Sequence, residues 1–299
     1  MNSQTFIMRF QPVFAILFAV SLFLLTSCPE DTDPINGNPP DSTTTLETLI
    51  FNHGGLNRTY SIYLPENLPA NAPLIFVLHG IYESRADCYA YGFDQVADTA
   101  GFAVCYPQGS STDKGIPYWN ARLNLSTVDD IGFLTELAEF LQQEHDLDPD
   151  RTFCCGFSNG GYMSYTLACE APGEFKAIAS VAGLMSEHSW SNCTPTDPTP
   201  VLHIHGLSDN TVNIDGDTYF GGEPPLDVII NFWVALNNCT ATDTVSIGTT
   251  TTAYLHRNGT NGNEVWCYLI NNHIHKWPLY TSNIGINATE VIWEFFSKY

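Results

Sequence analysis

The feature that most constrains the fold is a serine between two glycines at the end of a short apolar run. Residues 153–161 read Phe-Cys-Cys-Gly-Phe-Ser-Asn-Gly-Gly, so Ser158 lies between Gly156 and Gly160. A strand that turns sharply into a helix strains its turn residue, and flanking glycines let the two arms approach. A turn and a strand pattern precede the motif, and a helical pattern follows it until Pro172. We therefore predict a strand, a sharp turn and a helix that expose Ser158 as a nucleophile.

A second apolar run lies upstream and predicts the rest of the oxyanion hole. Residues 73–80 are apolar until they end in His-Gly, as in a strand buried on both faces of a parallel sheet. We expect His79 to be structural, and Ile81 or Tyr82 to supply one backbone N–H donor to an oxyanion. The other donor is expected to be the N–H of Asn159, where the helix dipole also favours negative charge.

The catalytic acid is expected after the serine in the chain. Residues 200–209, Pro-Val-Leu-His-Ile-His-Gly-Leu-Ser-Asp, form a further buried strand that ends in a loop. Asp209 is the first carboxylate of that loop and is our candidate. Asp215 and Asp217 lie farther into the loop and are the alternatives.

The general base is expected last. Residues 265–270 have the pattern of a final strand, and the loop after them contains His273 and His275. A loop histidine just past the last strand is in the position of a general base. The spacing alone leaves both histidines as candidates.

Taken in order, the motifs of this chain resemble one known family. They are similar to those of the extracellular polyhydroxybutyrate depolymerase and feruloyl esterase group of α/β-hydrolases, which includes acetylxylan esterases. The resemblance implies an α/β-hydrolase fold, with a mostly parallel sheet, helices on both faces and the nucleophile elbow at Ser158. The family's base is the histidine two residues before Trp-Pro, which implies His275. The matching segments are 58–65, 78–80, 101–107, 119–120, 128–133, 148–152, 156–163, 167–169, 175–183, 205–209, 275–278 and 288–296.

The resemblance also implies an activity. It indicates a serine esterase that needs no cofactor and acts on feruloyl or acetyl esters of plant cell-wall polysaccharide through an acyl-enzyme on Ser158. Short hydroxyalkanoate polyesters are the second candidate substrate. A catalytically silent surface-binding lipoprotein is the alternative of another class, and the complete set of serine, acid and base argues against it. Trp119, Trp277 and Tyr82 would wall a groove for a sugar or phenolic ring, although core packing is equally expected for each.

Two histidine pairs raise the question of a metal. His203-x-His205 and His273-x-His275 have a spacing that could ligate zinc. We expect His203 and His205 to point to opposite faces of their strand, which would keep them from one ion. We therefore predict no metal, because a serine mechanism needs none.

The N-terminus predicts export. An apolar stretch of signal-peptide length precedes Leu25-Thr-Ser-Cys28, which resembles a bacterial lipobox with Cys28 as the lipid-bearing residue. We predict a lipoprotein signal peptide over residues 1–27, a disordered acidic tether over 28–45 and the catalytic domain over 46–299. The resulting location is the cell envelope, with the cell surface as one candidate site of exposure. Ordinary signal-peptide cleavage, with free secretion, is the alternative.

The cysteines agree with an oxidising compartment. Nine are present, and eight remain once Cys28 is set aside. The family resemblance implies that Cys169 pairs with Cys193 and that Cys239 pairs with Cys267. Cys154 and Cys155 are adjacent in a strand and point to opposite faces, so no bond between them is expected. Four cysteines remain without an assigned pairing: Cys88, Cys105, Cys154 and Cys155.

Charge limits the partners. The net charge is −22 and the isoelectric point is about 4.4, which disfavours nucleic acid and anionic lipid as partners. Asp129 and Asp130 are expected at a helix N-terminus, where they hold a nearby loop. We expect a monomer that meets an ester substrate and touches the membrane only through its lipid anchor.

Overall fold

The computed structural model describes residues 46–112, 114–216 and 223–299 of the chain. The predicted signal peptide (1–27) and tether (28–45), with Cys28, lie outside the described residues, as does Asp217. Within the described ranges, no helix combines the length and the apolar character that a membrane span requires.

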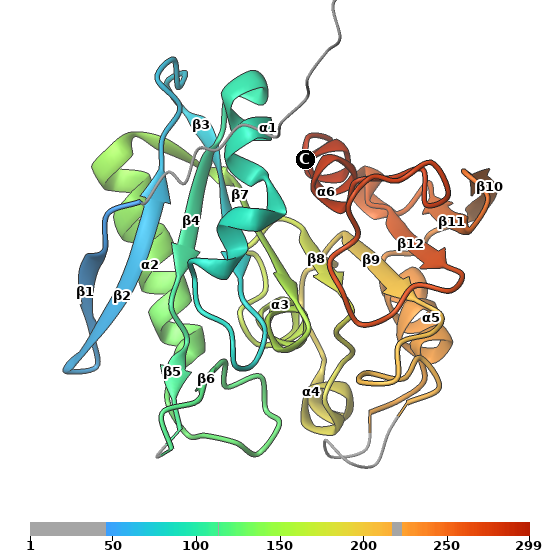
Figure 1. The fold of residues 1–299 in the computed structure, drawn as a ribbon, viewed down its shortest axis with the longest axis horizontal. Coiled ribbons are helices and arrows are strands. Elements are labelled where there is room, and N and C mark those ends of the chain that lie inside the picture. Colours follow the sequence, from blue (N-terminus) through green and yellow to red (C-terminus); the bar gives the residue numbers. More distant parts are fainter. Residues whose placement is uncertain (1–45, 113, 217–222) are drawn as a thin grey trace, which may run out of the picture. The chain divides into compact units, whose positions relative to one another are not determined.

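A ten-stranded sheet runs through the described domain in the order β1-β2-β4-β3-β7-β8-β9-β12-β11-β10 (Figure 1). The six strands from β4 to β12 in that order are parallel, and the flanking strands are antiparallel. The predicted mostly parallel sheet is confirmed. A separate two-stranded pair consists of β5 (Ser110–Ser111) and β6 (Pro117–Tyr118). The strands of the large sheet are β1 Leu49–His53, β2 Leu56–Tyr63, β3 Ala72–Leu78, β4 Ala103–Pro107, β7 Leu147–Phe157, β8 Ile178–Val181, β9 Val201–Gly206, β10 Ala241–Ile247, β11 Thr251–Arg257 and β12 Val265–Ile270.

Helices cover both faces of the sheet, as predicted. α2 (Asp130–His145), α3 (Asn159–Glu170) and α5 (Leu226–Leu236) pack on one face, whereas α1 (Phe93–Ala100) and α6 (Ala288–Phe296) pack on the other. Short helical segments complete the domain: η1 Asp87–Tyr91, α4 Glu187–Asn192 and η2 Thr260–Gly262.

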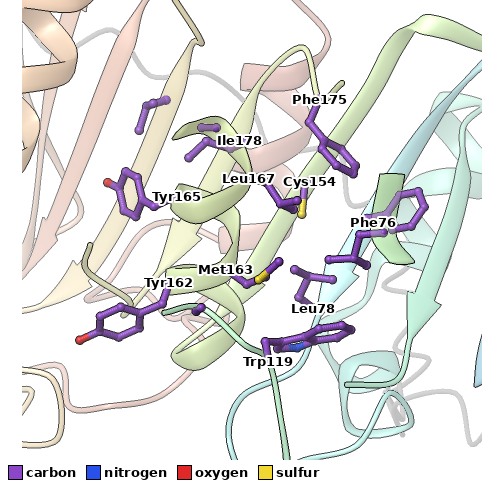
Figure 2. Packing of buried hydrophobic residues seen from close by; sticks show 14 of the residues in the cluster. Phe76, Leu78, Trp119, Cys154, Tyr162, Met163, Tyr165, Leu167, Phe175 and Ile178 are labelled. Atoms are coloured by element: carbon purple, nitrogen blue, oxygen red, sulfur yellow. The ribbon is translucent and has the colours of Figure 1, made fainter. Parts of the chain in front are cut away.

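The central strands are apolar on both sides because both sides are covered. All seven residues of β3 are buried. Phe76, Leu78 and Cys154 share one core cluster with Met163 of α3 and with Trp119 (Figure 2). Cys155 faces the other cluster, so adjacent Cys154 and Cys155 do point to opposite faces.

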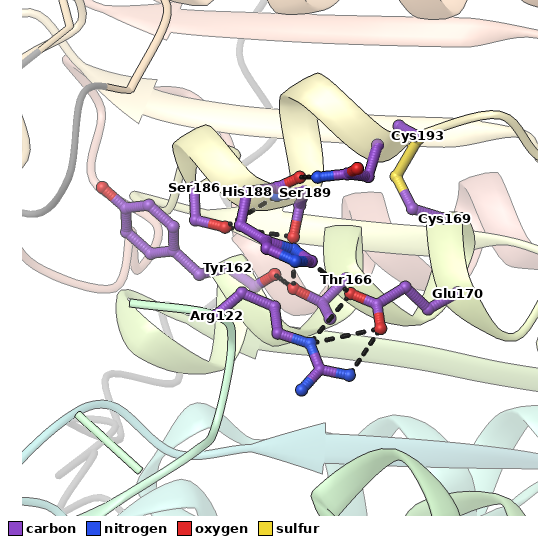
Figure 3. The surroundings of a disulfide bond; sticks show 10 residues. Arg122, Tyr162, Thr166, Cys169, Glu170, Ser186, His188, Ser189 and Cys193 are labelled. Carbon is purple, nitrogen blue, oxygen red and sulfur yellow. Dashed lines mark hydrogen bonds and ion pairs between the residues drawn. A yellow bond between two sulfur atoms is a disulfide. The ribbon is translucent and has the colours of Figure 1, made fainter. Parts of the chain in front are cut away.

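One disulfide is present among the described cysteines. It joins Cys169 at the end of α3 to Cys193 after α4 (Figure 3), as the family resemblance implied. The expected bond between Cys239 and Cys267 is corrected: both are free thiols. Cys267 is buried within β12, and the Cys239 thiol is directed at the Asn263 carbonyl, 3.8 Å away. The remaining free thiols are all buried: Cys88, Cys105, Cys154 and Cys155.

Candidate active site

The turn between β7 and α3 holds Ser158 in a strained conformation. Its φ is +52° and its ψ is −117°, a combination that residues other than glycine rarely adopt. The two glycines make the turn possible, since a Cβ on Gly156 would lie 2.4 Å from the Gly160 backbone, and one on Gly160 would lie 2.3 Å from the Leu78 oxygen. The serine N–H donates to the Val181 oxygen at 2.8 Å, which ties the turn to the end of β8.

The structure brings Ser158, His275 and Asp209 together. His275 Nε2 lies 2.9 Å from the serine Oγ, and His275 Nδ1 lies 2.6 Å from Asp209 Oδ2. The three residues follow β7, β12 and β9, whose carboxyl ends meet at one edge of the sheet. With its Nδ1 proton donated to the carboxylate, His275 can accept the serine proton at Nε2.

Asp209 is held as an anion by its surroundings. Burial acts to raise the pKa of this carboxyl, but hydrogen bonds from His205 and His275 outweigh it and hold the pKa well below the ordinary 3.8. Its Oδ1 also accepts the backbone N–H groups of Thr211 and Val212 at 2.8 and 2.9 Å. The side chain therefore has one oxygen fixed by the loop backbone and the other free to orient His275.

The alternatives to the acid and the base lie elsewhere. Asp215 is exposed, and its N–H donates to the Asn213 side chain at 2.9 Å. His273 Nε2–H donates to the Lys276 carbonyl at 2.9 Å, so this ring braces its own loop and does not approach Ser158.

Two backbone N–H groups remain to bind an oxyanion. Of the two candidates after Gly80, Tyr82 is already engaged, because its N–H donates to the Pro117 oxygen at 3.1 Å. The Gly80 N–H is taken by Glu83 Oε2 at 2.8 Å. Among the described contacts, the N–H groups of Ile81 and Asn159 have no acceptor, and both residues line the pocket beside Ser158. Ile81 and Asn159 are therefore the available pair of donors.

The Asn159 side chain fixes the loop that lies over the elbow. Its Oδ1 accepts the Trp119 backbone N–H at 2.6 Å, and the Trp119 indole N–H donates to the His79 oxygen at 3.0 Å. His79 is buried, and its pKa is lowered to about 4 by burial. It therefore stays neutral and serves the scaffold, as expected, by accepting the Gly109 N–H at 3.0 Å.

Two of the three aromatic residues expected in the substrate groove are not there. Trp119 is fully buried by the contacts just described. Trp277 is 5% exposed and stacks on the Tyr91 ring at 4.1 Å. Both expectations are corrected: these indoles pack beneath the catalytic loops. Tyr82 is 72% exposed and lines the cleft at the serine.

The predicted helix N-terminus at Asp129 and Asp130 supports the same region. Asp129 caps α2 by accepting the Gly132 N–H at 2.9 Å. Asp130 is buried, pairs with Arg58 Nη2 at 2.6 Å and accepts the Asn120 N–H at 2.7 Å. It therefore anchors the loop next to Trp119 and takes no part in the chemistry.

Two hollows of very different size meet at Ser158. The larger is a cleft of about 690 Å³ that includes Tyr82, Glu83, Phe157 and His275. The smaller holds about 40 Å³, includes Asn159, Tyr162 and Val212, and does not reach His275. Four loop residues that belong to no sequence motif help to line the two hollows, so the sequence did not identify these residues. They are Leu123, Leu125, Thr211 and Val212.

The expectation for His203 and His205 was wrong. Residues two apart in a strand point to the same face, and the two rings stack at 5.2 Å with His203 Nε2 3.0 Å from His205 Nδ1. Neither pair of histidines belongs to a metal cluster: the described part of the chain contains no group of three or more potential metal-ligating side chains.

Sequence comparison points to esterases. A family model described as the prolyl oligopeptidase family matches residues 94–195. The putative esterase NocK of Nocardia uniformis subsp. tsuyamanensis is 32% identical over 208 residues, which are 66% of this chain and 60% of that protein. Feruloyl esterase C of Emericella nidulans is 33% identical over 189 residues, 62% of this chain and 64% of that protein. The chain thus spans somewhat less than two thirds of the length of these relatives.

Solved structures show the same fold. The acetyl xylan esterase from Aspergillus awamori superposes with a TM-score of 0.65 at 16% identity, over 85% of this chain and all of that one. The Bacillus cereus carboxylesterase gives 0.53 at 15% identity, over 81% of this chain and 94% of that one. The solved structures thus show an α/β-hydrolase fold, and the sequence relatives show that the chain is similar to esterases.

Proposed function

We propose that this protein is an esterase that removes acetyl groups from a bulky alcohol, with acetylated plant cell-wall polysaccharide as the substrate class. The observation that carries the proposal is the contrast between the two hollows at Ser158, about 40 and 690 Å³. A short acyl group fits the first, and a sugar chain fits the second.

The assignment of the two hollows follows from the mechanism. Ser158 Oγ attacks the ester carbonyl while His275 takes its proton, and the oxyanion is held by the N–H groups of Ile81 and Asn159. His275 then gives the proton to the departing alcohol, so the alcohol must leave on the His275 side. Because His275 borders only the large cleft, the alcohol belongs there and the acyl chain belongs in the small pocket.

The small pocket discriminates between the candidate acyl groups. About 10–15 Å³ of such space admits one water-sized group, so 40 Å³ takes about three such groups, which is enough for a short acyl chain such as acetyl. A feruloyl ring and the chain of a hydroxyalkanoate polymer both exceed it. The relatives include a bifunctional acetylxylan esterase/xylanase of Neocallimastix patriciarum, 26% identical over 160 residues, and poly(3-hydroxyalkanoate) depolymerase C of Paucimonas lemoignei, 28% identical over 124. The pocket favours the first kind of substrate.

The test is acyl-chain selectivity with p-nitrophenyl esters, acetylated xylan and methyl ferulate. We expect kcat/KM for the acetate to exceed that for the octanoate by about tenfold or more, because a pocket discriminates by each methylene it cannot hold. Val212→Ala enlarges the small pocket and should narrow the ratio. Val291→Ala, on α6, is the matched control for losing a buried valine and should leave the ratio unchanged.

If methyl ferulate is hydrolysed as fast as the acetyl ester, the acetyl assignment is wrong and feruloyl esters are the favoured substrate. Selective turnover of hydroxybutyrate oligomers would instead favour the polyester substrate. If the protein hydrolyses none of these ester substrates, it is the catalytically silent binding protein.

We also propose that the enzyme is a monomer held at the cell envelope by lipid on Cys28. The support is the Leu25-Thr-Ser-Cys28 sequence after an apolar stretch. The mature protein should then begin at Cys28 and partition into detergent, and Cys28→Ala should make it soluble, because buried acyl chains contribute about 0.8 kcal/mol per CH₂ to membrane retention. A soluble wild-type product that begins at a neighbouring residue would show ordinary secretion.

A further inference from the structure

A chain of buried polar side chains extends from Asp209 away from the substrate. His205 Nε2 lies 2.9 Å from the Val212 oxygen and 3.4 Å from Asp209 Oδ2. Its Nδ1 lies 3.0 Å from His203 Nε2, and His203 Nδ1 lies 3.0 Å from the Tyr165 hydroxyl. The serine mechanism described above uses none of the three residues behind Asp209.

The chain is closed off from water. Tyr165 and His203 are fully buried, and His205 is 1% exposed. Burial, and then the neighbouring His205, lower the pKa of His203 well below its ordinary value, so that ring stays neutral. The Trp233 ring packs against Tyr165 at the far end. Polar groups buried this deeply are expected only where each has a partner.

The contacts define where each proton lies. A carbonyl oxygen can only accept, so His205 Nε2 must carry a proton for Val212. His203 is neutral, so only one of its ring nitrogens carries a proton. In the His205 tautomer with its single proton on Nε2, Nδ1 is an acceptor and His203 donates from Nε2. His203 Nδ1 in turn accepts the proton of Tyr165. All hydrogen bonds in this series of side chains therefore donate in one direction, from the Tyr165 phenol toward Val212 and Asp209.

We propose that His205 is a positioning residue for the catalytic carboxylate, and that His203 and Tyr165 lock it in the tautomer that donates toward Asp209. The proposal rests on the proposed esterase function of Ser158. The His205 N–H donates to the Val212 carbonyl, and His205 Nε2 also lies 3.4 Å from Asp209 Oδ2, the same oxygen that accepts from His275. His205 thereby restrains Asp209 Oδ2, whereas Oδ1 is held by the backbone N–H groups of the loop.

The His205 N–H beside Asp209 Oδ2 also sets how strongly the carboxylate attracts the proton of His275. The titratable groups that face Asp209 are His205 from β9, His275 after β12 and Tyr162 from α3, the last of which also faces Glu223. Tyr162 stays neutral, because burial and Glu223 raise its pKa well above the ordinary value. Without the His205 donor, the carboxylate binds the proton on His275 more tightly, so the base is neutralised only at higher pH.

The experiment measures the pH dependence of Ser158 phosphonylation by a fluorophosphonate, followed by intact mass, so that no ester substrate is needed. His205→Leu removes the donor, and His205→Gln restores an N–H near the Nε2 position. Tyr165→Phe removes only the hydroxyl that locks the chain. Tyr106→Phe is the matched control, since its buried hydroxyl donates to Asp94 at 2.5 Å on the other face of the sheet.

We expect His205→Leu to label about tenfold more slowly, and its acid limb to move to higher pH by about half a unit. His205→Gln should recover most of the rate, and Tyr165→Phe should give a smaller shift in the same direction. Tyr106→Phe should lower thermal stability without moving the pH profile.

An unchanged acid limb in His205→Leu, or equal losses in His205→Leu and His205→Gln, would overturn the proposal and leave His205 as core packing. A wild-type protein that is not labelled at Ser158 would overturn it as well. Labelling of wild type without hydrolysis of acetyl esters would refute only the proposed substrate, and the positioning role would still be supported by the variants.

Discussion

The elbow geometry makes Gly160→Ala the sharpest test of how the site is built. An alanine Cβ there would lie 2.3 Å from the Leu78 oxygen and 2.8 Å from the His79 oxygen, both backbone atoms at the end of β3. Carbon and oxygen ordinarily approach no closer than about 3.3 Å, so α3 and this segment must separate by about 1 Å. α3 begins at Asn159, and the segment continues into Ile81. The two oxyanion donors therefore move apart.

We expect Gly160→Ala to lose about 1–3 kcal/mol of unfolding free energy through overpacking and about 100-fold in kcat through the displaced donors. Gly173→Ala is the control: its φ of +87° strains an alanine, but its Cβ would meet nothing within 4 Å. It should cost about 1–2 kcal/mol with kcat unchanged. Urea denaturation and p-nitrophenyl acetate kinetics measure both quantities. A Gly160→Ala enzyme that keeps kcat within about twofold of wild type would refute the reasoning.

Three further results are expected. His275→Ala should abolish esterase activity nearly completely, while His273→Ala stays within about tenfold of wild type; steady-state kinetics distinguish the two, and the reverse order would move the base. Replacing Cys169 and Cys193 by serine should lower the unfolding free energy by about 3 kcal/mol in urea, because the bond closes a loop with a sequence separation of 24, and an unchanged midpoint would contradict this. Folding lowers the pKa of Asp209 below 3.8, so its ionised form stabilises the fold above that pH and this contribution is lost as the pH falls. The difference in unfolding free energy between wild type and Asp209→Asn should therefore shrink from pH 7 to pH 3. A difference that grows over this range would contradict the reasoning.

The parts of the site that the sequence predicted are those that depend on backbone constraints. The elbow needs Gly156 and Gly160 because nothing larger fits, and that requirement is visible in the sequence itself. The order of Ser158, Asp209 and His275 follows from parallel strands that end at one edge of the sheet. The choice of Ile81 over Tyr82 was left open, because only the folded loop shows which N–H is already engaged.

The parts that could not be predicted depend on which way side chains pack. Trp119 and Trp277 lie next to catalytic motifs, yet both rings pack into the core. No local sequence pattern distinguishes an aromatic ring that lines a groove from one that is buried beneath it. The bond that the family resemblance implied between Cys239 and Cys267 failed for the same reason, since a resemblance does not give the direction of a thiol. The small pocket beside Ser158 is lined in part by loop residues that belong to no motif: Leu123, Leu125, Thr211 and Val212.

Because His203 and His205 were expected on opposite faces of β9, the contact between these buried histidines was not predicted from the sequence. Once His203 and His205 share a face, each buried nitrogen needs a partner, because leaving one unsatisfied costs about 1–3 kcal/mol. The observed chain meets that need from Tyr165 to Val212 and ends beside Asp209. Removing any single member leaves its neighbour without a partner, whereas apolar replacement of all members together would restore packing but not the donor toward the carboxylate. Stability alone therefore does not require these histidines, and what distinguishes them from an apolar core is the proton directed at the catalytic acid.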